Sequence, residues 1–550
     1  MKLTPIAISA AALVLTAGLS ACGGGGDSAP AQTGPQSQTI SGVAATGAAM
    51  PGATVNVTCS AGSGTATTSA DGSYSAPITG ASLPCVVTAT SSDGKTVLHS
   101  LVAGSGSISS AATANITPLT ELLLAQLAGQ DPAKYVAGFS STTTVNASDV
   151  TAAQAALIKV LQSAGFDASG ISDFLGGTIS AGSGQGYDGV LDTLQSTLAG
   201  AGVTLTDLST VVASTSGSSS GSAGSTVGTV LAPANSACPA LKSGDHRLVK
   251  FSDGSAQVVT VDAVKLTVAM GGASYQLTQG ATACDYSLND TGSTRVLVAK
   301  SGMAVWTNGT GSTGTLSLSV PKQTVDPSAV NGNYLYALLS GQDQGTFGTN
   351  NYAKGVVTAA TNCAVNAPCA PDLNSPYGHM VATSDGGVDW VDDGASAGTV
   401  DAHAYGFKNA QGNMVFVVAL TGGGVGIFAQ QTTLSVPAVG TTNAFWQSNV
   451  KSTGLTAVTE DSNTITAVNG STVTRTFADN HTDQIIYNDP FNGLRHRPGT
   501  AVCTNTSGVT VTCNQTWQLP LGGLTLALSG SPSITPSTYQ VNFSVNKPAQ

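Results

Sequence analysis

The sequence predicts a multi-domain, mainly β protein: a small β-sandwich, a short α-helical bundle and a large antiparallel β sandwich or barrel at the C-terminal end. Three observations support this fold class. The chain has 550 residues, too many for one ordinary core. Its 67 glycines and its frequent Thr and Val favour strands joined by tight turns. Only between residues 111 and 214 do apolar residues recur with the 3.6-residue period of helices.

The first segment, residues 1–21, has the order of a secretory signal. Lys2 is followed by an apolar stretch at 6–15 and by small residues up to Ala21. The apolar stretch is too short for a membrane-spanning helix, which needs about 20 apolar residues. The sequence therefore predicts export, with an ordinary signal peptide and an incidental cysteine at residue 22 as one alternative.

The residues Leu19-Ser20-Ala21-Cys22, followed by four glycines, resemble the lipobox of bacterial lipoproteins. The resemblance implies cleavage before Cys22 and diacylation of its thiol, which anchors the chain to a membrane through lipid. Because no Asp follows Cys22, the resemblance to enteric lipoproteins also implies sorting to the outer membrane. The polar, glycine-rich residues 22–39 are then a flexible tether.

The number of cysteines, nine, is consistent with a lipid-anchored exported protein. If Cys22 is acylated, eight remain for cross-linking, and an oxidising compartment favours disulfides. The spacings contain no Cys-x-x-Cys, so we expect no zinc or thioredoxin-like site and predict no metal. We predict pairing of sequence neighbours: Cys59 with Cys85, Cys238 with Cys284, Cys363 with Cys369, and Cys503 with Cys513.

Residues 40–110 are expected to form the small β-sandwich. Apolar and polar residues alternate in 54–59 and in 85–90, which places Cys59 and Cys85 on the buried faces of their strands. Asp71-Gly72 is a typical hairpin turn.

Two segments of this region, 47–55 (GAAMPGATV) and 68–75 (TSADGSYS), resemble the carboxypeptidase regulatory-like domain. Met50-Pro51 stands where that family usually has Pro-Leu or Pro-Val. The resemblance implies a transthyretin-like β-sandwich that is non-catalytic and acts as a spacer or binding unit.

Residues 111–214 are expected to form the helical bundle. Thr117-Pro118 begins a helix that ends at Gly129, and Ser148-Asp149 begins a second that ends at Gly165. A third is expected over 190–198 and a short fourth over 207–212. Residues 215–236 begin with a Ser/Gly-rich run that has no apolar periodicity, and are interpreted as a linker.

Residues 237–550 are expected to be β-rich, because apolar strand-like runs alternate with turn signals such as Asn469-Gly470 and Asn492-Gly493. Asp326-Pro327 suggests a possible division near residue 326. The net charge of −11 disfavours a nucleic-acid partner. We predict no cofactor.

Two clusters of residues could carry chemistry. Residues 394–398 match G-x-S-x-G around Ser396, with His403 nearby, but a strand-like run follows where the nucleophile elbow needs a helix, which favours a β-turn. Four aspartates at 385, 389, 392 and 393 could bind calcium or form a solvated acidic turn.

Arg495, His496 and Arg497 are the weak ligand candidates, because they form a basic group in a chain with few basic residues. They could bind an anion such as a sugar acid or lipid headgroup, or pair with acidic residues. Trp306, Trp390, Trp446 and Trp517 could be sugar platforms, although buried Trp in β cores is more common.

These observations favour a lipid-anchored envelope protein with a non-catalytic binding or structural role and an unknown glycan or protein ligand. A carbohydrate- or polymer-binding surface protein and an envelope hydrolase with an unrecognised site are the alternatives. No catalytic residue is predicted.

Overall fold

The computed structural model describes residues 37–108, 111–341, 344–364, 367–530 and 540–548. The described chain is mainly β and contains several antiparallel sheets, as the sequence predicts. Cys22, the signal segment and the tether up to residue 36 lie outside the described residues.

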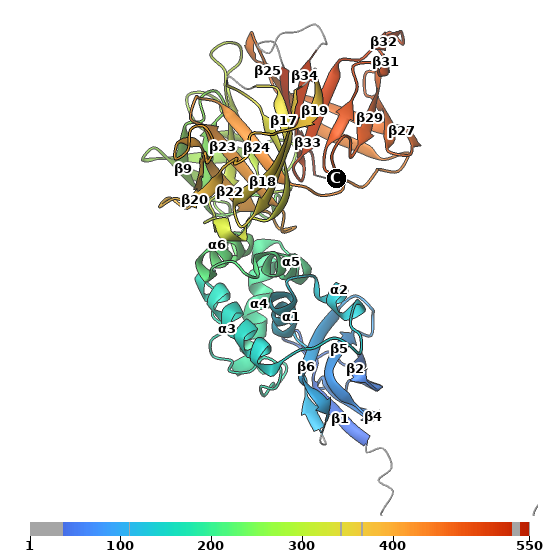
Figure 1. Ribbon diagram of the computed structural model, residues 1–550. Coiled ribbons are helices and arrows are strands. Elements are labelled where there is room, and N and C mark those ends of the chain that lie inside the picture. The colour runs from blue at the N-terminus through green and yellow to red at the C-terminus, as the bar shows by residue number, and fades with distance from the viewer. Residues whose placement is uncertain (1–36, 109–110, 342–343, 365–366, 531–539, 549–550) are drawn as a thin grey trace, which may run out of the picture. The chain divides into compact units, whose positions relative to one another are not determined.

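The N-terminal strands form two sheets that share one apolar core (blue in Figure 1). One sheet has the order β4-β1-β7 and the other β3-β2-β5-β6. Val55, Val57 and Cys59 are buried while their neighbours in 54–58 are exposed, which confirms the predicted alternation. The strands are β1 (Ser37–Val43), β2 (Thr54–Ala61), β3 (Ser63–Thr67), β4 (Ser73–Thr79), β5 (Ser82–Thr90), β6 (Val97–Ser107) and β7 (Ala111–Thr113).

Six helices follow within residues 118–231, and most of their buried residues share a second core with Leu101 of β6. Thr117 caps the first helix and Gly129 ends it in the left-handed region with φ of 60°, both at the predicted positions. No helix in the described ranges is long and apolar enough to span a membrane. The helices are α1 (Pro118–Ala128), α2 (Pro132–Ala137), α3 (Ala147–Ser163), α4 (Gly186–Ala201), α5 (Leu205–Thr215) and α6 (Ser220–Leu231).

Helix α6 shows that the linker expectation for 215–236 is wrong over most of its length. The side chain of Ser219 accepts a hydrogen bond from the backbone N–H of Ser222 and caps the helix. Val227, Val230 and Leu231 are buried. Gly224 lies so close to α3 that a Cβ there would be 2.2 Å from the Cβ of Ser163. The small residues therefore serve close helix packing rather than flexibility.

The β-rich region contains three closed arrangements of eight strands each, which we call barrels A, B and C. Barrel A closes in the order β10-β11-β12-β13-β14-β15-β8-β9. Its interior holds an apolar core that includes Val259, Tyr286 and Trp306. Its strands are β8 (Gly244–Lys250), β9 (Ala256–Asp262), β10 (Thr267–Met270), β11 (Ala273–Gln279), β12 (Asp285–Leu288), β13 (Arg295–Val298), β14 (Ala304–Asn308) and β15 (Thr315–Pro321).

Barrel B follows after the 3₁₀ turn Pro327–Ala329, which contains the expected division point near residue 326 in its N-cap. Its strands run β17-β16-β24-β23-β22-β21-β20-β18, and pairing of β17 with β18 closes them. Tyr334, Tyr336, Phe416 and Phe428 belong to its apolar core. The strands are β16 (Gly332–Leu338), β17 (Thr346–Ala353), β18 (Val356–Ala364), β20 (His379–Ala382), β21 (Val388–Val391), β22 (Val400–Lys408), β23 (Met414–Leu420) and β24 (Val425–Gln430), with β19 (Ala367–Pro371) beside β18.

Barrel C runs β28-β27-β25-β35-β34-β33-β30-β29, and pairing of β28 with β29 closes it. Its strands are β25 (Thr442–Lys451), β27 (Thr459–Asn469), β28 (Thr472–Phe477), β29 (Thr482–Tyr487), β30 (Arg495–Arg497), β33 (Gln515–Pro520), β34 (Leu524–Gly530) and β35 (Gln540–Asn546). Strand β26 (Gly454–Leu455) pairs with β25, and β31 (Val502–Thr504) joins β32 (Thr510–Thr512) to β29.

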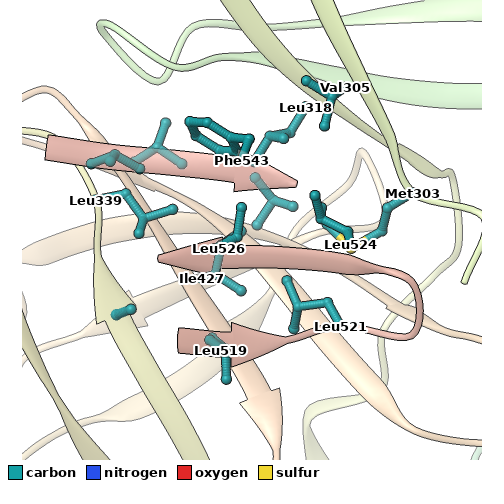
Figure 2. Close-up of a cluster of buried hydrophobic side chains, with 14 of the residues drawn as sticks. Met303, Val305, Leu318, Leu339, Ile427, Leu519, Leu521, Leu524, Leu526 and Phe543 are labelled. Carbon is teal, nitrogen blue, oxygen red and sulfur yellow. The ribbon is translucent and has the colours of Figure 1, made fainter. Parts of the chain in front are cut away.

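The outward side chains of barrel C pack against both other barrels in one large apolar cluster. Figure 2 shows Leu524, Leu526 and Phe543 of barrel C beside side chains from the other two barrels. Those partners include Met303, Val305 and Leu318 from barrel A, and Leu339 and Ile427 from the part of the chain that builds barrel B. Successive side chains of a strand point to opposite faces of the sheet. The residues between these apolar ones therefore face the interior of barrel C.

The four predicted disulfides are confirmed. Cys59 pairs with Cys85, Cys238 with Cys284, Cys363 with Cys369, and Cys503 with Cys513. The first joins β2 and β5 at directly opposite positions of the sheet.

Candidate binding cavity in barrel C

Barrel C contains a cavity of about 260 Å³. This is near the lower end of small-molecule sites, about 300 Å³. Most lining side chains are polar and uncharged, in contrast to the apolar interiors of barrels A and B. They are Asn443, Gln447, Asn449, Asn463, Thr516, Gln518, Thr525, Ser529, Asn542, Ser544 and Asn546.

The strand registers place these residues side by side on the inner face. Gln447 of β25 lies opposite Ser544 of β35, and Ser544 lies opposite Thr525 of β34. Asn449 and Asn542 are opposite one another in the same way. Strands β25, β35 and β34 therefore present a wall made mostly of amides and hydroxyls, interrupted by Phe445 and Ala527.

A buried ion cluster lies on the other side of the cavity. The guanidinium of Arg475 donates from Nε and Nη2 to the two carboxylate oxygens of Asp483, at 2.8 and 2.6 Å. Arg497 donates from Nη1 to Asp483 Oδ2 at 2.7 Å. Asp483 is 2% exposed and Arg475 is 7% exposed. Burial acts to raise the pKa of Asp483, but Arg475 and Arg497 outweigh it, and the pKa is lowered overall.

Arg495 lies next to this cluster without a carboxylate of its own. Its Nη2 donates to Thr525 Oγ1 at 3.0 Å, and its guanidinium lies 5.5 Å from the ring centroid of Tyr487. Its Nε is buried and has no hydrogen-bond partner among the described residues. Burial lowers the pKa of Arg495, and the Arg475 guanidinium adds to this effect.

The cavity lining therefore carries excess positive charge. Three guanidinium groups face one carboxylate, and the other ionisable side chains that line it are His481 and Tyr487. His481 pairs with Asp479, and its ring stacks on Phe477 at a centroid distance of 4.0 Å. An apolar group of Ile465, Val473 and Ile485 packs against Tyr487 beside the polar lining. The arrangement can hold a small, polar, negatively charged molecule.

The three basic residues that the sequence suggests as ligand candidates form strand β30 (Arg495–Arg497). Because successive side chains of a strand point to opposite faces, they do not all face the cavity. Arg495 and Arg497 line the cavity, whereas His496 stacks on Trp517 at a centroid distance of 3.6 Å. The ring of His496 also contacts Asp489 at 2.7 Å. Sequence reasoning missed Arg475 and Asp483, although both occupy inward positions of alternating strands.

The G-x-S-x-G segment does not form a nucleophile elbow. Ser396 lies in an exposed turn, where its backbone N–H donates to Asp392 Oδ2 at 2.9 Å. The strand β22 follows, as expected, instead of a helix. His403 is held through Nδ1 by Asp389 Oδ1 at 2.6 Å.

The remaining two aspartates of the acidic stretch have different partners. Asp385 lies between Arg247, at 3.2 Å, and the Nε2 of His403, at 3.4 Å. Asp393 contacts the Nδ1 of His379 at 2.9 Å. In the described part of the chain, no group of three or more His, Cys, Asp or Glu side chains could hold a metal ion.

Three of the four tryptophans, Trp306, Trp446 and Trp517, are buried, and Trp390 is partly buried against the barrel B core. Trp446 and Trp517 belong to the apolar cluster between the barrels. They therefore act as core residues.

Comparison with known proteins finds no matching family model and no matching curated protein.

Proposed function

We propose that this chain is a lipid-anchored cell-envelope protein in which barrel C binds a small polar molecule without catalysis. The observation that carries the proposal is the interior of barrel C. Barrels A and B fill their interiors with apolar side chains, while barrel C lines a cavity with amides, hydroxyls and guanidiniums. Buried polar groups without hydrogen-bond partners lower the stability of the folded protein. We therefore infer that barrel C keeps its polar interior because that interior binds a ligand.

The charge arrangement in the cavity supports binding rather than chemistry. Asp483 is the carboxylate among the described lining residues, and it accepts three hydrogen bonds from Arg475 and Arg497. These arginines lower its pKa. A carboxylate held in this way is a weak general base, because its proton affinity is reduced.

The proposed anchor is Cys22, acylated after cleavage of the signal segment, with the outer membrane as location. The tether is proposed to be residues 22–36, because 37–39, expected to belong to it, lie in β1. The four disulfides support an oxidising compartment. Mass spectrometry of the mature protein tests this part: we expect a diacylated N-terminal Cys22, and its loss when the lipoprotein signal peptidase is inhibited by globomycin. An unmodified Cys22 would contradict the anchor.

The segments between tether and barrels are proposed as a spacer. The two N-terminal sheets share a core in the manner of a β-sandwich, which supports the resemblance to the carboxypeptidase regulatory-like domain. The helices share a separate core, which supports a small bundle.

The binding function is tested by filling the cavity. Ser544, a small inward residue of β35, is replaced by Trp, and the exposed Thr466 of β27 is replaced by Trp as the matched control. The full chain in detergent is screened by thermal shift against neutral and acidic monosaccharides and small organic acids. We expect ligand-induced stabilisation in the wild type and in Thr466→Trp but none in Ser544→Trp. Equal stabilisation in both variants would show that binding occurs elsewhere.

A further inference from the structure

We propose that the molecule bound in barrel C is a sugar acid, whose carboxylate contacts Arg495 and whose hydroxyl groups contact the wall of strands β25, β35 and β34. This inference rests on the proposed function, because it specifies the ligand class of the same cavity. Three features carry it: the unpaired arginine, the chemistry of the adjoining wall and the size of the space.

The first feature is the difference between the three arginines. Arg475 and Arg497 share Asp483, and Arg497 also donates to the carbonyl oxygen of Asn514 at 2.9 Å and to Thr516 Oγ1 at 2.8 Å. Among the described residues, Arg495 donates to Thr525 and lies against Tyr487, but it contacts no carboxylate. Its buried Nε has no partner within the described ranges. A buried donor without an acceptor is costly, and a ligand acceptor removes that cost.

The charge of the cavity selects an anion. Asp483 offsets one of the three guanidiniums, so two positive charges are left without a counterion among the lining residues. This occurs in a chain whose net charge is −11. A carboxylate fits Arg495 best, since its two oxygens can accept in parallel from Nε and a neighbouring Nη.

The second feature is that the wall next to Arg495 suits hydroxyl groups. Thr525, the residue that Arg495 contacts, is opposite Ser544, which is opposite Gln447. Asn542 donates to Gln447 Oε1 at 3.4 Å and to Asn449 Oδ1 at 3.2 Å, so these amides can exchange weak mutual bonds for bonds to a ligand. Amides and hydroxyls both donate and accept, as sugar hydroxyls do.

The third feature is the limited space and its aromatic margin. The cavity volume of about 260 Å³ favours one sugar residue over a polymer. Phe445 is among the lining residues and offers apolar surface to the C–H face of a sugar ring, whereas the ring of Phe477 is already stacked on His481.

Isothermal titration calorimetry of the full chain in detergent tests the inference, with D-glucuronate, D-glucose and inorganic phosphate as probes. The variants are Arg495→Gln, Arg495→Lys and, as the control, Lys159→Gln, which removes an exposed positive charge from α3. We expect glucuronate to bind at least about tenfold more tightly than glucose, since a hydrogen bond to a charged group contributes about that factor or more. We also expect it to bind more tightly than phosphate, which lacks the ring hydroxyl groups that the wall of β25, β35 and β34 would contact. Arg495→Gln is expected to raise the Kd for glucuronate at least about tenfold, Arg495→Lys to do so partly, and Lys159→Gln to leave it unchanged.

The melting temperature without ligand separates a binding role from a structural one. Because Arg495 is not compensated in the free protein, Arg495→Gln is expected to leave that temperature unchanged or raised. A lowered melting temperature in both Arg495 variants together with unchanged glucuronate affinity would overturn the inference. Equal affinity for glucose and glucuronate would overturn it and leave the proposed function standing, as would tighter binding of phosphate. If all three probes and the thermal-shift panel fail to bind, the proposed function fails as well.

Discussion

Replacing Asp483 with Asn is expected to destabilise barrel C strongly. The substitution keeps the side-chain size but removes the negative charge that holds Arg475 and Arg497. Three short hydrogen bonds, at 2.8, 2.6 and 2.7 Å, lose their charged acceptor. Breaking a buried ion pair by removing one partner typically costs about 3–5 kcal/mol. We expect the lower part of that range, about 3 kcal/mol, because the Asn oxygen can still accept a hydrogen bond.

The matched control is Asp479→Asn in the turn between β28 and β29. Asp479 is 54% exposed and pairs with His481 at the surface. Such a pair contributes about 0–1 kcal/mol. Hydrogen-exchange mass spectrometry of peptides from β28 and β29 measures the local opening free energy in both variants. Opening free energies of Asp483→Asn and Asp479→Asn that agree within about 0.5 kcal/mol would refute the reasoning.

The same prediction has a pH dependence with a defined sign. The folded pKa of Asp483 is lowered, so its contribution to stability is fully present above the unfolded value, about 3.9. The contribution is lost as the pH falls through the lower, folded pKa. Acid titration of barrel C stability should therefore show a loss below about pH 4 in the wild type and a smaller one in Asp483→Asn.

Three further outcomes are expected. Gly224→Ala should lower the stability in thermal unfolding by about 1–3 kcal/mol, since its Cβ would lie 2.2 Å from that of Ser163. The control Gly221→Ala, which has open space around it, should be neutral or stabilising. Equal effects of the two substitutions would contradict the close α3–α6 contact. Glu121→Gln should cost about 1–3 kcal/mol, because the Glu121 carboxylate accepts from the backbone N–H of His99 at 2.7 Å and contacts its ring, and an unchanged melting temperature would contradict this. Thiol titration of the denatured chain should detect none of the eight paired cysteines before reduction and all of them afterwards.

Short sequence patterns correctly predicted features that depend on neighbouring residues, such as strand alternation and helix caps. The alternation of Val55, Val57 and Cys59 gave the buried face of β2, and Thr117 and Gly129 gave the ends of α1. The disulfide partners followed from sequence proximity. Helix α6 was missed because its apolar residues are few and its glycines, which read as flexible, serve close packing.

The cavity could not be located from sequence, because alternation marks two faces of a strand without telling which is inside. In β25 the apolar Trp446 faces a neighbouring barrel and the polar Gln447 faces the interior, the reverse of the usual arrangement. The apolar faces of these strands point outward because the other two barrels cover the exterior of barrel C. Arg495 and Arg497 could be singled out by composition, but Asp483, the partner of Arg497, is brought to it by strand pairing.

The inverted arrangement of barrel C has a consequence for dissecting the protein. The exterior of barrel C is its apolar side, and residues from earlier in the chain, such as Met303 and Ile427, cover it. A fragment starting near residue 440 would expose Trp446, Leu526 and Phe543 to water and would aggregate. Barrel C is thus inseparable from its two neighbours, and transplanting it to another scaffold requires moving residues 237–550 as one piece.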